Sequence, residues 1–319
     1  DAEELMDYTL TRNVKKLSVG QIVYSSMCYE NGSMFDDGTL LKMSDHGFRW
    51  VCGDEYAGEW LKEQAKKKRL NVLVKNSTDQ INNISLQGPN SRKILEKFIF
   101  TPPTQPSISE LQWFRFTICR VKELSGIPLM VSRTGYTGEL GYEIWCHPSD
   151  APAVWDVLME AGKDEGLIPA GFGALDLLRI EAGLILFGNE FDGQVDPFEA
   201  GVGFTVPLKT KTADFIGKEA LIKRKENPQK KLVGLELVGK EKANHGDCVH
   251  IGRSQVGVVT SGCLSPTLNK NIALCRIDVG HSEIGMNVEV GKIDGHQKRI
   301  PAKVVGFPHY DPQKTRVKS

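Results

Sequence analysis

The order of hydrophobic and polar positions divides the chain into two regions of different texture. Up to about residue 208, short strand-like runs alternate with amphipathic helical segments. From residue 231 onward, short strand-like runs follow one another with only turns between them: LVGLELV, SQVGVVTSG, IALCRID, MNVEV and RIPAKVVGF. We therefore expect an α+β region over residues 1–208 and a small all-β domain, a barrel or jelly-roll-like sandwich, over residues 209–319.

Within this pattern, individual elements can be assigned by their periodicity and end signals. Helical spacing, with Pro152 in a first turn and Gly162 just past an end, predicts helices at 57–68, 90–98, 150–161, 174–182 and 215–225, and a helix followed by a basic turn over 2–17. Strands are expected at 21–28, 39–43, 48–52, 84–87, 114–121, 128–132 and 143–146. Strand pairs mixed with helices in this order favour α+β layers over a doubly wound parallel sheet.

Composition excludes several classes of function. The 319 residues carry 40 basic and 40 acidic side chains, so the formal net charge is zero and nothing favours nucleic acid or an anionic membrane as partner. No apolar run approaches the roughly 20 residues that span a bilayer. The polar opening DAEELMDYTLTR is no signal peptide, and the missing initiator Met indicates a processed or truncated product. We expect a soluble protein of the cytoplasm or, in a eukaryote, of the mitochondrial matrix.

The cysteines and histidines indicate neither disulfides nor a metal site. The seven cysteines are odd in number, scattered and never paired as CxxC, which is typical of reduced, buried thiols. Cys248-x-His250 and Cys146-His147 are too isolated to supply the three or four converging ligands of a zinc centre. We therefore expect no metal.

A glycine-rich segment, SRTGYTGELGYEIW over residues 132–145, carries an unusual density of chemical groups. Its glycines are spaced GxxGxxG, which fits neither a dinucleotide fingerprint nor a phosphate loop. The structural interpretation is a strand–turn–strand whose glycines supply positive φ. The functional one rests on Glu143, which lies in an apolar strand where an unpaired carboxylate would be costly. Such an acid could accept paired hydrogen bonds from a flat, amino-bearing heterocycle.

Two pairs of charged residues leave alternatives open. Asp36 and Asp37 are adjacent on a predicted strand, so they point to opposite faces and only one is expected to face a cavity. They could equally be a turn or edge-strand pair of acids. Arg179 and Glu181 lie two apart on a predicted helix, which favours an internal salt bridge or a helix-surface role.

A series of motifs resembles a known family. YSSMCYENGSMFDD, LQGPNS, RTGYTGELGYEI, LRIEAGLILFGNEFD, DFIGKEAL and VTSGCLSPTLNKNIAL occur in this order, as in the glycine-cleavage T-protein (aminomethyltransferase) family. The resemblance covers nearly the whole chain, to about Pro308, but the family's first segment is missing. It implies two α+β units and a C-terminal β-domain around a central channel that holds tetrahydrofolate.

The resemblance also implies roles for particular residues. Asp36 matches the family's acid near the reacting folate nitrogens, where it would steer the donor and stabilise cationic character as the one-carbon unit moves. Glu143 matches the carboxylate that holds the pterin ring, a task that suits a group able to accept two N–H bonds. Tyr24 and Tyr136 match aromatic positions that line the folate pocket.

Departures from the family concern the donor side. The family's Ala-Arg-Asp is here Ala174-Leu175-Asp176, and its Val-Asn is here Cys52-Gly53. The donor is therefore open. It is an aminomethyl group on a lipoyl-carrier protein, giving methylene-tetrahydrofolate and ammonia, or, in a demethylase paralogue, a methyl group on dimethylsulfoniopropionate or a methylated glycine, giving methyl-tetrahydrofolate.

Two further hypotheses are disfavoured. A non-catalytic folate-binding accessory protein would carry a reactive Cys motif near residues 184–190, which here read LILFGNE. The folate domain of a larger flavoprotein dehydrogenase would accompany a dinucleotide-binding half, which this sequence lacks.

Overall fold

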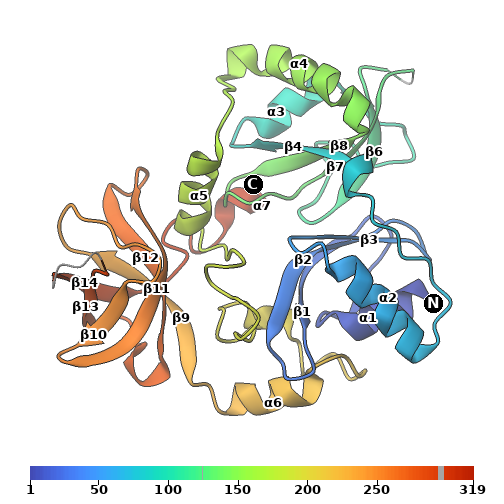
Figure 1. The fold of residues 1–319 in the computed structure, drawn as a ribbon. Coiled ribbons are helices and arrows are strands. Elements are labelled where there is room, and N and C mark those ends of the chain that lie inside the picture. Colours follow the sequence, from blue (N-terminus) through green and yellow to red (C-terminus); the bar gives the residue numbers. More distant parts are fainter. Residues whose placement is uncertain (124, 294–297) are drawn as a thin grey trace.

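Three lobes surround a common centre in the computed structural model, which describes residues 1–123, 125–293 and 298–319 (Figure 1). The N-terminal lobe and the middle lobe are mixed helix and strand, and the C-terminal lobe is a barrel. The expected α+β architecture with a C-terminal β-barrel is confirmed.

The N-terminal lobe is an antiparallel sheet with two helices against it. Its strands β1 (Ile22–Cys28), β2 (Met34–Lys42) and β3 (Phe48–Cys52) pair in that order. The helices α1 (Ala2–Thr9) and α2 (Ala57–Lys68) bury their apolar faces in a core that includes Leu5, Leu40 and Trp60. The apolar residues of the 12-residue helix α2 recur every three to four positions, which places them on one face and leaves the lysines on the solvent side.

The helix followed by a basic turn that is predicted over residues 2–17 is confirmed, and the structure fixes where the helix ends. It ends at Thr9, and only a 3₁₀ turn at Val14–Lys16 follows. The reason is a long-range contact: the ammonium of the buried Lys211 donates to the carbonyls of Asp7, Leu10 and Arg12. These oxygens are therefore satisfied from outside the helix, and the sequence near residue 10 gives no sign of a partner 200 positions away.

The middle lobe is a five-stranded antiparallel sheet of order β4-β8-β7-β6-β5. Its strands are β4 (Asn82–Gln87), β5 (Ile99–Phe100), β6 (Phe116–Val121), β7 (Pro128–Ser132) and β8 (Gly141–Cys146). The helices α3 (Ser91–Glu96) and α4 (Ala151–Gly162) share its core, in which Val131, Ile144 and Val154 are fully buried. The prediction that this is no doubly wound parallel sheet is confirmed.

The C-terminal lobe is a closed barrel of order β10-β11-β12-β9-β14-β13. It contains β9 (Lys230–Leu237), β10 (Cys248–Ile251), β11 (Ser254–Ser265), β12 (Lys270–Asp278), β13 (Asn287–Gly291) and β14 (Arg299–Val305), and α6 (Lys218–Glu226) precedes it. The strand β10 was not predicted. It has only four residues, and its polar His250 weakens the hydrophobic alternation.

Helix α5 (Phe172–Glu181) and the segment after it join the middle lobe to the barrel, and the chain returns to the centre through α7 (Thr315–Lys318) (Figure 1). Further 3₁₀ turns lie at Thr78–Gln80, Pro148–Asp150, Lys163–Glu165, Gly203–Thr205 and Val279–His281. Within the part of the chain that the structure describes, no helix is both long and apolar enough to cross a membrane.

Candidate functional site

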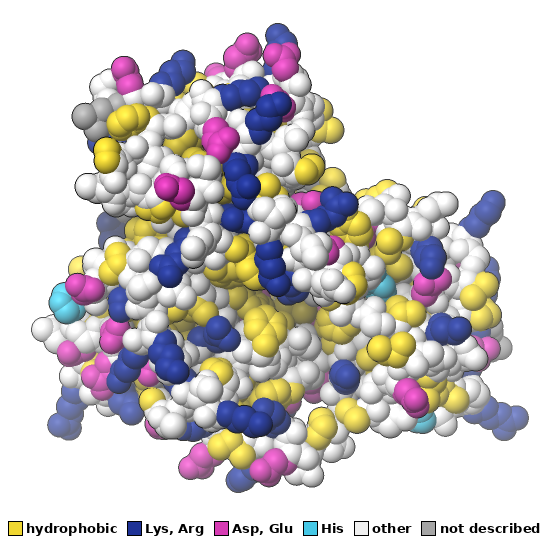
Figure 2. Space-filling view, turned by 180° about the vertical axis from the view of Figure 1, so that it is seen from behind, with side chains coloured by type: hydrophobic (Ala, Val, Ile, Leu, Met, Phe, Trp, Pro, Cys, Tyr) yellow, Lys and Arg dark blue, Asp and Glu magenta, His cyan; other side chains and the backbone are white. Residues whose placement is uncertain are grey.

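A cavity of about 840 Å³ lies where the three lobes meet. Figure 2 shows it as a hollow at the centre of the molecule, with hydrophobic side chains at its base. Its walls come from β1 and β2, residues 113–114, the glycine-rich turn, residues 182–185, residues 201–204 and the C-terminal segment 307–317. This volume is within the range of pockets that enclose a drug-sized ligand.

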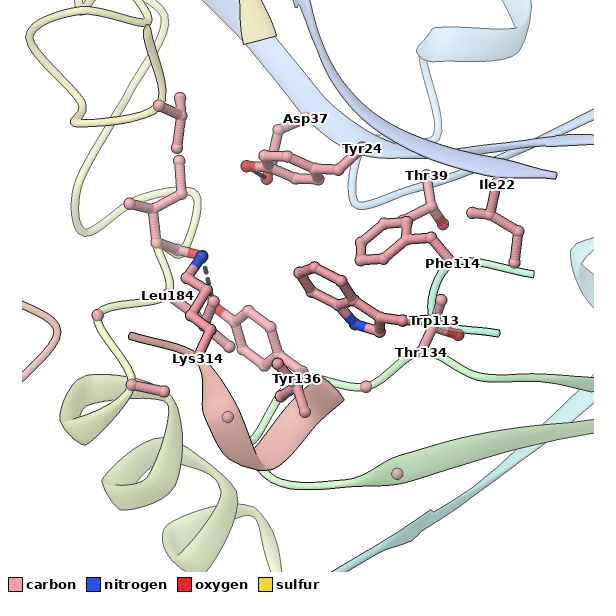
Figure 3. A pocket seen from close by; sticks show the side chains of 18 of the residues that line it. Ile22, Tyr24, Asp37, Thr39, Trp113, Phe114, Thr134, Tyr136, Leu184 and Lys314 are labelled. Carbon is pink, nitrogen blue, oxygen red and sulfur yellow. Dashed lines mark hydrogen bonds between the residues drawn. The ribbon is translucent and has the colours of Figure 1, made fainter. Parts of the chain in front are cut away.

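Aromatic side chains dominate the walls. Trp113 and Phe114 project into the middle of the cavity, between Tyr24 on one side and Tyr136 on the other (Figure 3). The rings of Tyr24 and Phe204 lie 6.0 Å apart, centroid to centroid. Trp113 is 37% exposed although it is among the largest apolar side chains, which indicates a surface shaped for a flat ligand.

The two adjacent aspartates lie in different places. Asp37 lines the cavity beside Tyr24 (Figure 3), whereas Asp36 is 1% exposed and points to the other face of β2. Alternation along a strand puts neighbours on opposite faces, as expected. A bulge in the β1–β2 pairing, where Cys28 opposes Met34 but Met27 opposes Asp36, lies directly before the pair.

Asp36 is held by backbone amides. Its carboxylate accepts hydrogen bonds from the N–H groups of Asp37, Gly53 and Asp54 at 2.8, 3.4 and 3.3 Å. Burial raises its pKa, and hydrogen bonds from the Cys52 thiol and these amides oppose the rise. Asp36 therefore links the residues after β3 to β2, and we expect it to stabilise the wall of the cavity from behind.

This position predicts a stability defect. In Asp36→Asn the amide nitrogen would face backbone N–H donors that the carboxylate now satisfies, and we expect the free energy of unfolding to fall by about 1–3 kcal/mol. Urea denaturation followed by circular dichroism measures it. An unchanged unfolding midpoint would contradict the structural role.

Asp37 is a cavity carboxyl whose pKa is shifted by its surroundings. The Tyr24 hydroxyl donates to its Oδ2 at 2.5 Å. Burial raises the pKa of Asp37 to about 6; the bond from Tyr24 lowers it and the charge of Asp36 raises it. Burial and the neighbouring Asp37 raise the pKa of Tyr24 well above its ordinary value, so that hydroxyl stays a donor. A carboxyl that titrates near neutrality is suited to proton transfer.

Glu143 lies on β8, in the lining of the same cavity. Its carboxylate accepts hydrogen bonds from the Asn83 side chain at 3.1 Å and from the Thr134 hydroxyl. A carboxylate has about four acceptor positions, so two remain for a ligand. The sequence predicts that this acid needs hydrogen-bond partners, and Asn83 on β4 and Thr134 in the turn supply them.

The glycine-rich turn owes its shape to close packing more than to positive φ. Of its three glycines only Gly138 has positive φ, 77°. Gly135 and Gly141 lie against the Gln87 side chain, whose Oε1 would be 2.0 and 1.9 Å from a Cβ at these positions. Gln87 in turn accepts a hydrogen bond from Thr137 at 2.9 Å. The turn is thus clamped to β4, and this clamp aims Tyr136 at the cavity.

Cationic side chains lie at one side of the cavity. Arg12 and Lys314 both line it, and the Lys314 ammonium is 5.9 Å from the centroid of the Phe204 ring. The Arg12 guanidinium donates to the Phe204 carbonyl at 2.9 Å. The cavity therefore has carboxylates, aromatic rings and cations in one volume, an arrangement suited to a flat heterocycle with an anionic end.

Comparisons with known proteins agree with this architecture. The profile of the GCVT N-terminal domain matches residues 1–210, and that of the glycine cleavage T-protein C-terminal barrel domain matches residues 230–311. The chain belongs to the glycine cleavage T-protein family. An aminomethyltransferase of this family from Symbiobacterium thermophilum is 40% identical over 315 residues, 97% of this chain and 81% of the relative. The T-protein family is folate-dependent. The domain boundary that we place after residue 208 stays a prediction.

A second relative differs in name and length. Trimethylamine-oxide aldolase from Ruegeria pomeroyi is 57% identical over 319 residues, 100% of this chain but 40% of the relative, so the chain spans less than half of that protein. Among solved structures, the glycine cleavage system aminomethyltransferase T from Bartonella henselae superposes with a TM-score of 0.83. That match is 24% identical and covers 97% of this chain and 81% of the other, and it establishes the shared T-protein fold.

Three of the four predicted site residues, Tyr24, Tyr136 and Glu143, line the cavity, whereas Asp36 does not and its neighbour Asp37 does. The catalytic role of Asp36 stays a prediction. Sequence reasoning missed Trp113, Phe114 and the C-terminal segment. Only the tandem aromatic pair before β6 could have drawn attention to the first two. Among the described residues no three His, Cys, Asp or Glu side chains converge as a metal site would require.

Proposed function

We propose that the cavity binds tetrahydrofolate and that the chain transfers a one-carbon unit to it from a small donor. The observation that carries this proposal is the placement of Asp37 and Glu143 in one aromatic-lined cavity of about 840 Å³. The Glu143 carboxylate has acceptor positions left for a heterocycle, and the pKa of Asp37 is raised to about 6.

The cavity's own residues fit a pterin. Glu143 uses only two of its acceptor positions within the protein, and a 2-aminopyrimidinone edge offers two adjacent N–H donors. Trp113, Phe114 and Tyr24 supply faces on which flat rings can stack. Arg12 and Lys314 would attract the carboxylates of the glutamate tail.

When bound, tetrahydrofolate supplies two amine nitrogens that accept the one-carbon unit. Ionised Asp37 stabilises positive charge that develops beside it and can take up the proton released from an amine, because its pKa is about 6. The Tyr24 hydroxyl holds the carboxylate in place, and the surrounding apolar walls exclude water, which strengthens this electrostatic effect.

The donor is the finer part of the proposal. The family's arginine is replaced by the half-buried Leu175, and the chain is more similar to trimethylamine-oxide aldolase than to the aminomethyltransferase from Symbiobacterium thermophilum. An aldolase releases a carbonyl compound, and the one-carbon carbonyl compound is formaldehyde. We therefore favour a one-carbon unit at the oxidation level of formaldehyde, giving methylene-tetrahydrofolate, over a methyl group.

A donor screen tests this. The chain is incubated with tetrahydrofolate and, in turn, formaldehyde, trimethylamine oxide, dimethylglycine, dimethylsulfoniopropionate or an aminomethylated lipoyl-carrier protein, and the folate product is identified by mass. Because formaldehyde condenses with tetrahydrofolate without an enzyme, rates are compared with a blank and with Asp37→Asn. Methyl-tetrahydrofolate as the product would contradict the oxidation level, and folate binding without turnover of any donor would favour an accessory role.

Trp113 offers a separate test of the ligand's shape. We expect Trp113→Leu, which keeps the apolar bulk but loses the ring, to weaken tetrahydrofolate binding about three- to tenfold in isothermal titration calorimetry. Trp113→Phe keeps an aromatic face and should retain most of the affinity. Equal affinities for the Leu and Phe variants would mean that stacking on residue 113 contributes nothing.

A further inference from the structure

A buried ion pair lies behind one wall of the cavity, where α5, the segment after it and the barrel meet. Arg179 on α5 and Glu190 are 1% and 0% exposed, and their Nη1 and Oε2 atoms are 2.8 Å apart. Neither side chain lines the cavity, and the proposed chemistry uses neither. A charge pair removed this completely from water stays favourable only if further hydrogen bonds satisfy its remaining atoms.

Those further bonds hold the backbone on both sides of Ile185. The Leu186 N–H donates to Glu190 Oε2 at 2.9 Å, and Arg179 Nη1 donates to the Leu184 carbonyl at 3.3 Å. Ile185 and Leu184 are cavity residues, and the Ile185 carbonyl accepts the hydrogen bond from the Tyr136 hydroxyl. The ion pair therefore fixes the peptide groups that orient Tyr136.

The barrel completes this arrangement through two hydroxyls of β11. Thr260 and Ser261, each 3% exposed, donate to Glu190 Oε1 at 2.8 and 2.6 Å. Ser261 also accepts from Arg179 Nη2 at 2.7 Å. The polar atoms of Glu190, Arg179, Thr260 and Ser261 thus satisfy one another's hydrogen bonds. Removing a hydroxyl from β11 therefore leaves the Glu190 carboxylate, or the Arg179 guanidinium, without one of its partners.

We propose that Glu190 and Arg179, with Ser261 and Thr260 from the barrel, are positioning residues for the Tyr136 wall of the folate cavity. This inference rests on the proposed function, since the wall matters through the folate that it contacts. It assigns the barrel a task in ligand binding although none of the residues that line the cavity is on β9 to β14.

The test uses Ser261→Ala and Thr260→Val, which remove one hydroxyl each and are milder than replacing Glu190. We expect each to weaken tetrahydrofolate binding about three- to tenfold in titration calorimetry. In a Tyr136→Phe background, which lacks the positioned hydroxyl, Ser261→Ala should add less than about twofold, because coupled residues are not additive.

Ser265→Ala is the matched control. Ser265 is on the same strand, is 0% exposed and donates to a different buried carboxylate, that of Glu181 on α5, at 2.5 Å, but it has no hydrogen bond to the 184–190 segment. We expect this variant to keep the wild-type affinity for tetrahydrofolate. Equal weakening by Ser265→Ala and Ser261→Ala would overturn the proposal, because the effect would then be general loosening of the interface.

Amide exchange gives a readout that needs no ligand. In Ser261→Ala and Thr260→Val the Leu186 amide should exchange with deuterium about tenfold faster or more, and in Ser265→Ala it should not. Unchanged exchange at Leu186 in both β11 variants would overturn the proposal even if folate binding changed. If the wild-type chain did not bind tetrahydrofolate, the proposed function would fail, and the exchange measurement would still decide whether the barrel positions this segment.

Discussion

Asp37→Asn is expected to lower kcat for one-carbon transfer about 10²- to 10⁴-fold, the range associated with loss of a positioned proton-transfer group. Asparagine has nearly the same shape and can still accept the Tyr24 hydrogen bond, but it has no charge and takes up no proton. Tetrahydrofolate affinity should change little, since the pterin is assigned to Glu143. Stopped-flow turnover with the donor found in the screen, alongside titration calorimetry, separates the two effects.

The same substitution should make the protein more stable. Because burial raises the pKa of Asp37 from 3.8 to about 6, the folded state binds this proton more tightly than the unfolded state does. The contribution of Asp37 to stability therefore falls as the pH rises from 3.8 to about 6 and stays unfavourable above that. At pH 7.5 we expect Asp37→Asn to raise the free energy of unfolding by about 1–3 kcal/mol, and below pH 3.8 the difference should vanish.

The pH dependence of kcat/KM supplies the control. With ionised Asp37 as the active form, kcat/KM should rise with pH through about 6 and then level off, and this limb should be absent in Asp37→Asn. Asp36→Asn, by contrast, should lose stability and keep the acidic limb. A flat profile in the wild type, or an Asp37→Asn variant with wild-type kcat, would remove Asp37 from the chemistry.

The lobes and most of their elements could be predicted because local signals coincide with the fold. The alternation in β9, β11 and β12 faces a single barrel core, and Pro152 and Gly162 mark the two ends of α4. The exact end of α1, at Thr9, could not be predicted, since the carbonyl of the next residue, Leu10, is bound by Lys211, which is distant in the chain. A long-range backbone contact leaves no local trace in the sequence.

The site was predictable in kind but not in detail. Glu143 stood out as an acid in an apolar strand, and its partners Asn83 and Thr134 explain how the fold tolerates it. Whether Asp36 or Asp37 lines the cavity depends on which face of β2 is turned toward it. A bulge beside the two residues shifts the register of the β1–β2 pairing, and the sequence does not reveal this shift. The hydrophobic pattern around Trp113 does not distinguish an aromatic residue that faces a ligand from one that lies in the core.

The second large effect is expected at Glu143. Glu143→Ala should weaken tetrahydrofolate binding about 10²-fold, because it removes a carboxylate that accepts two charge-assisted hydrogen bonds, each contributing about 1.5–3 kcal/mol. Part of that gain is offset in the wild type by the cost of desolvating the acid. Titration calorimetry with tetrahydrofolate measures the loss, and kcat at saturating folate should fall far less than the affinity.

Glu143→Gln separates charge from shape at this position. It keeps one acceptor oxygen and can still bond Asn83 or Thr134, so its affinity should lie between those of the wild type and the alanine variant. Glu139→Gln is a matched control: Glu139 also lines the cavity, but its carboxylate lies 3.5 Å from Arg316 of the C-terminal segment. If Glu143→Ala and Glu139→Gln bound tetrahydrofolate equally well, the pterin would have to lie elsewhere in the cavity. If only Glu143→Ala lost affinity, the ligand's N–H edge would be placed against β8, with Asp37 left free to act on the reacting nitrogens.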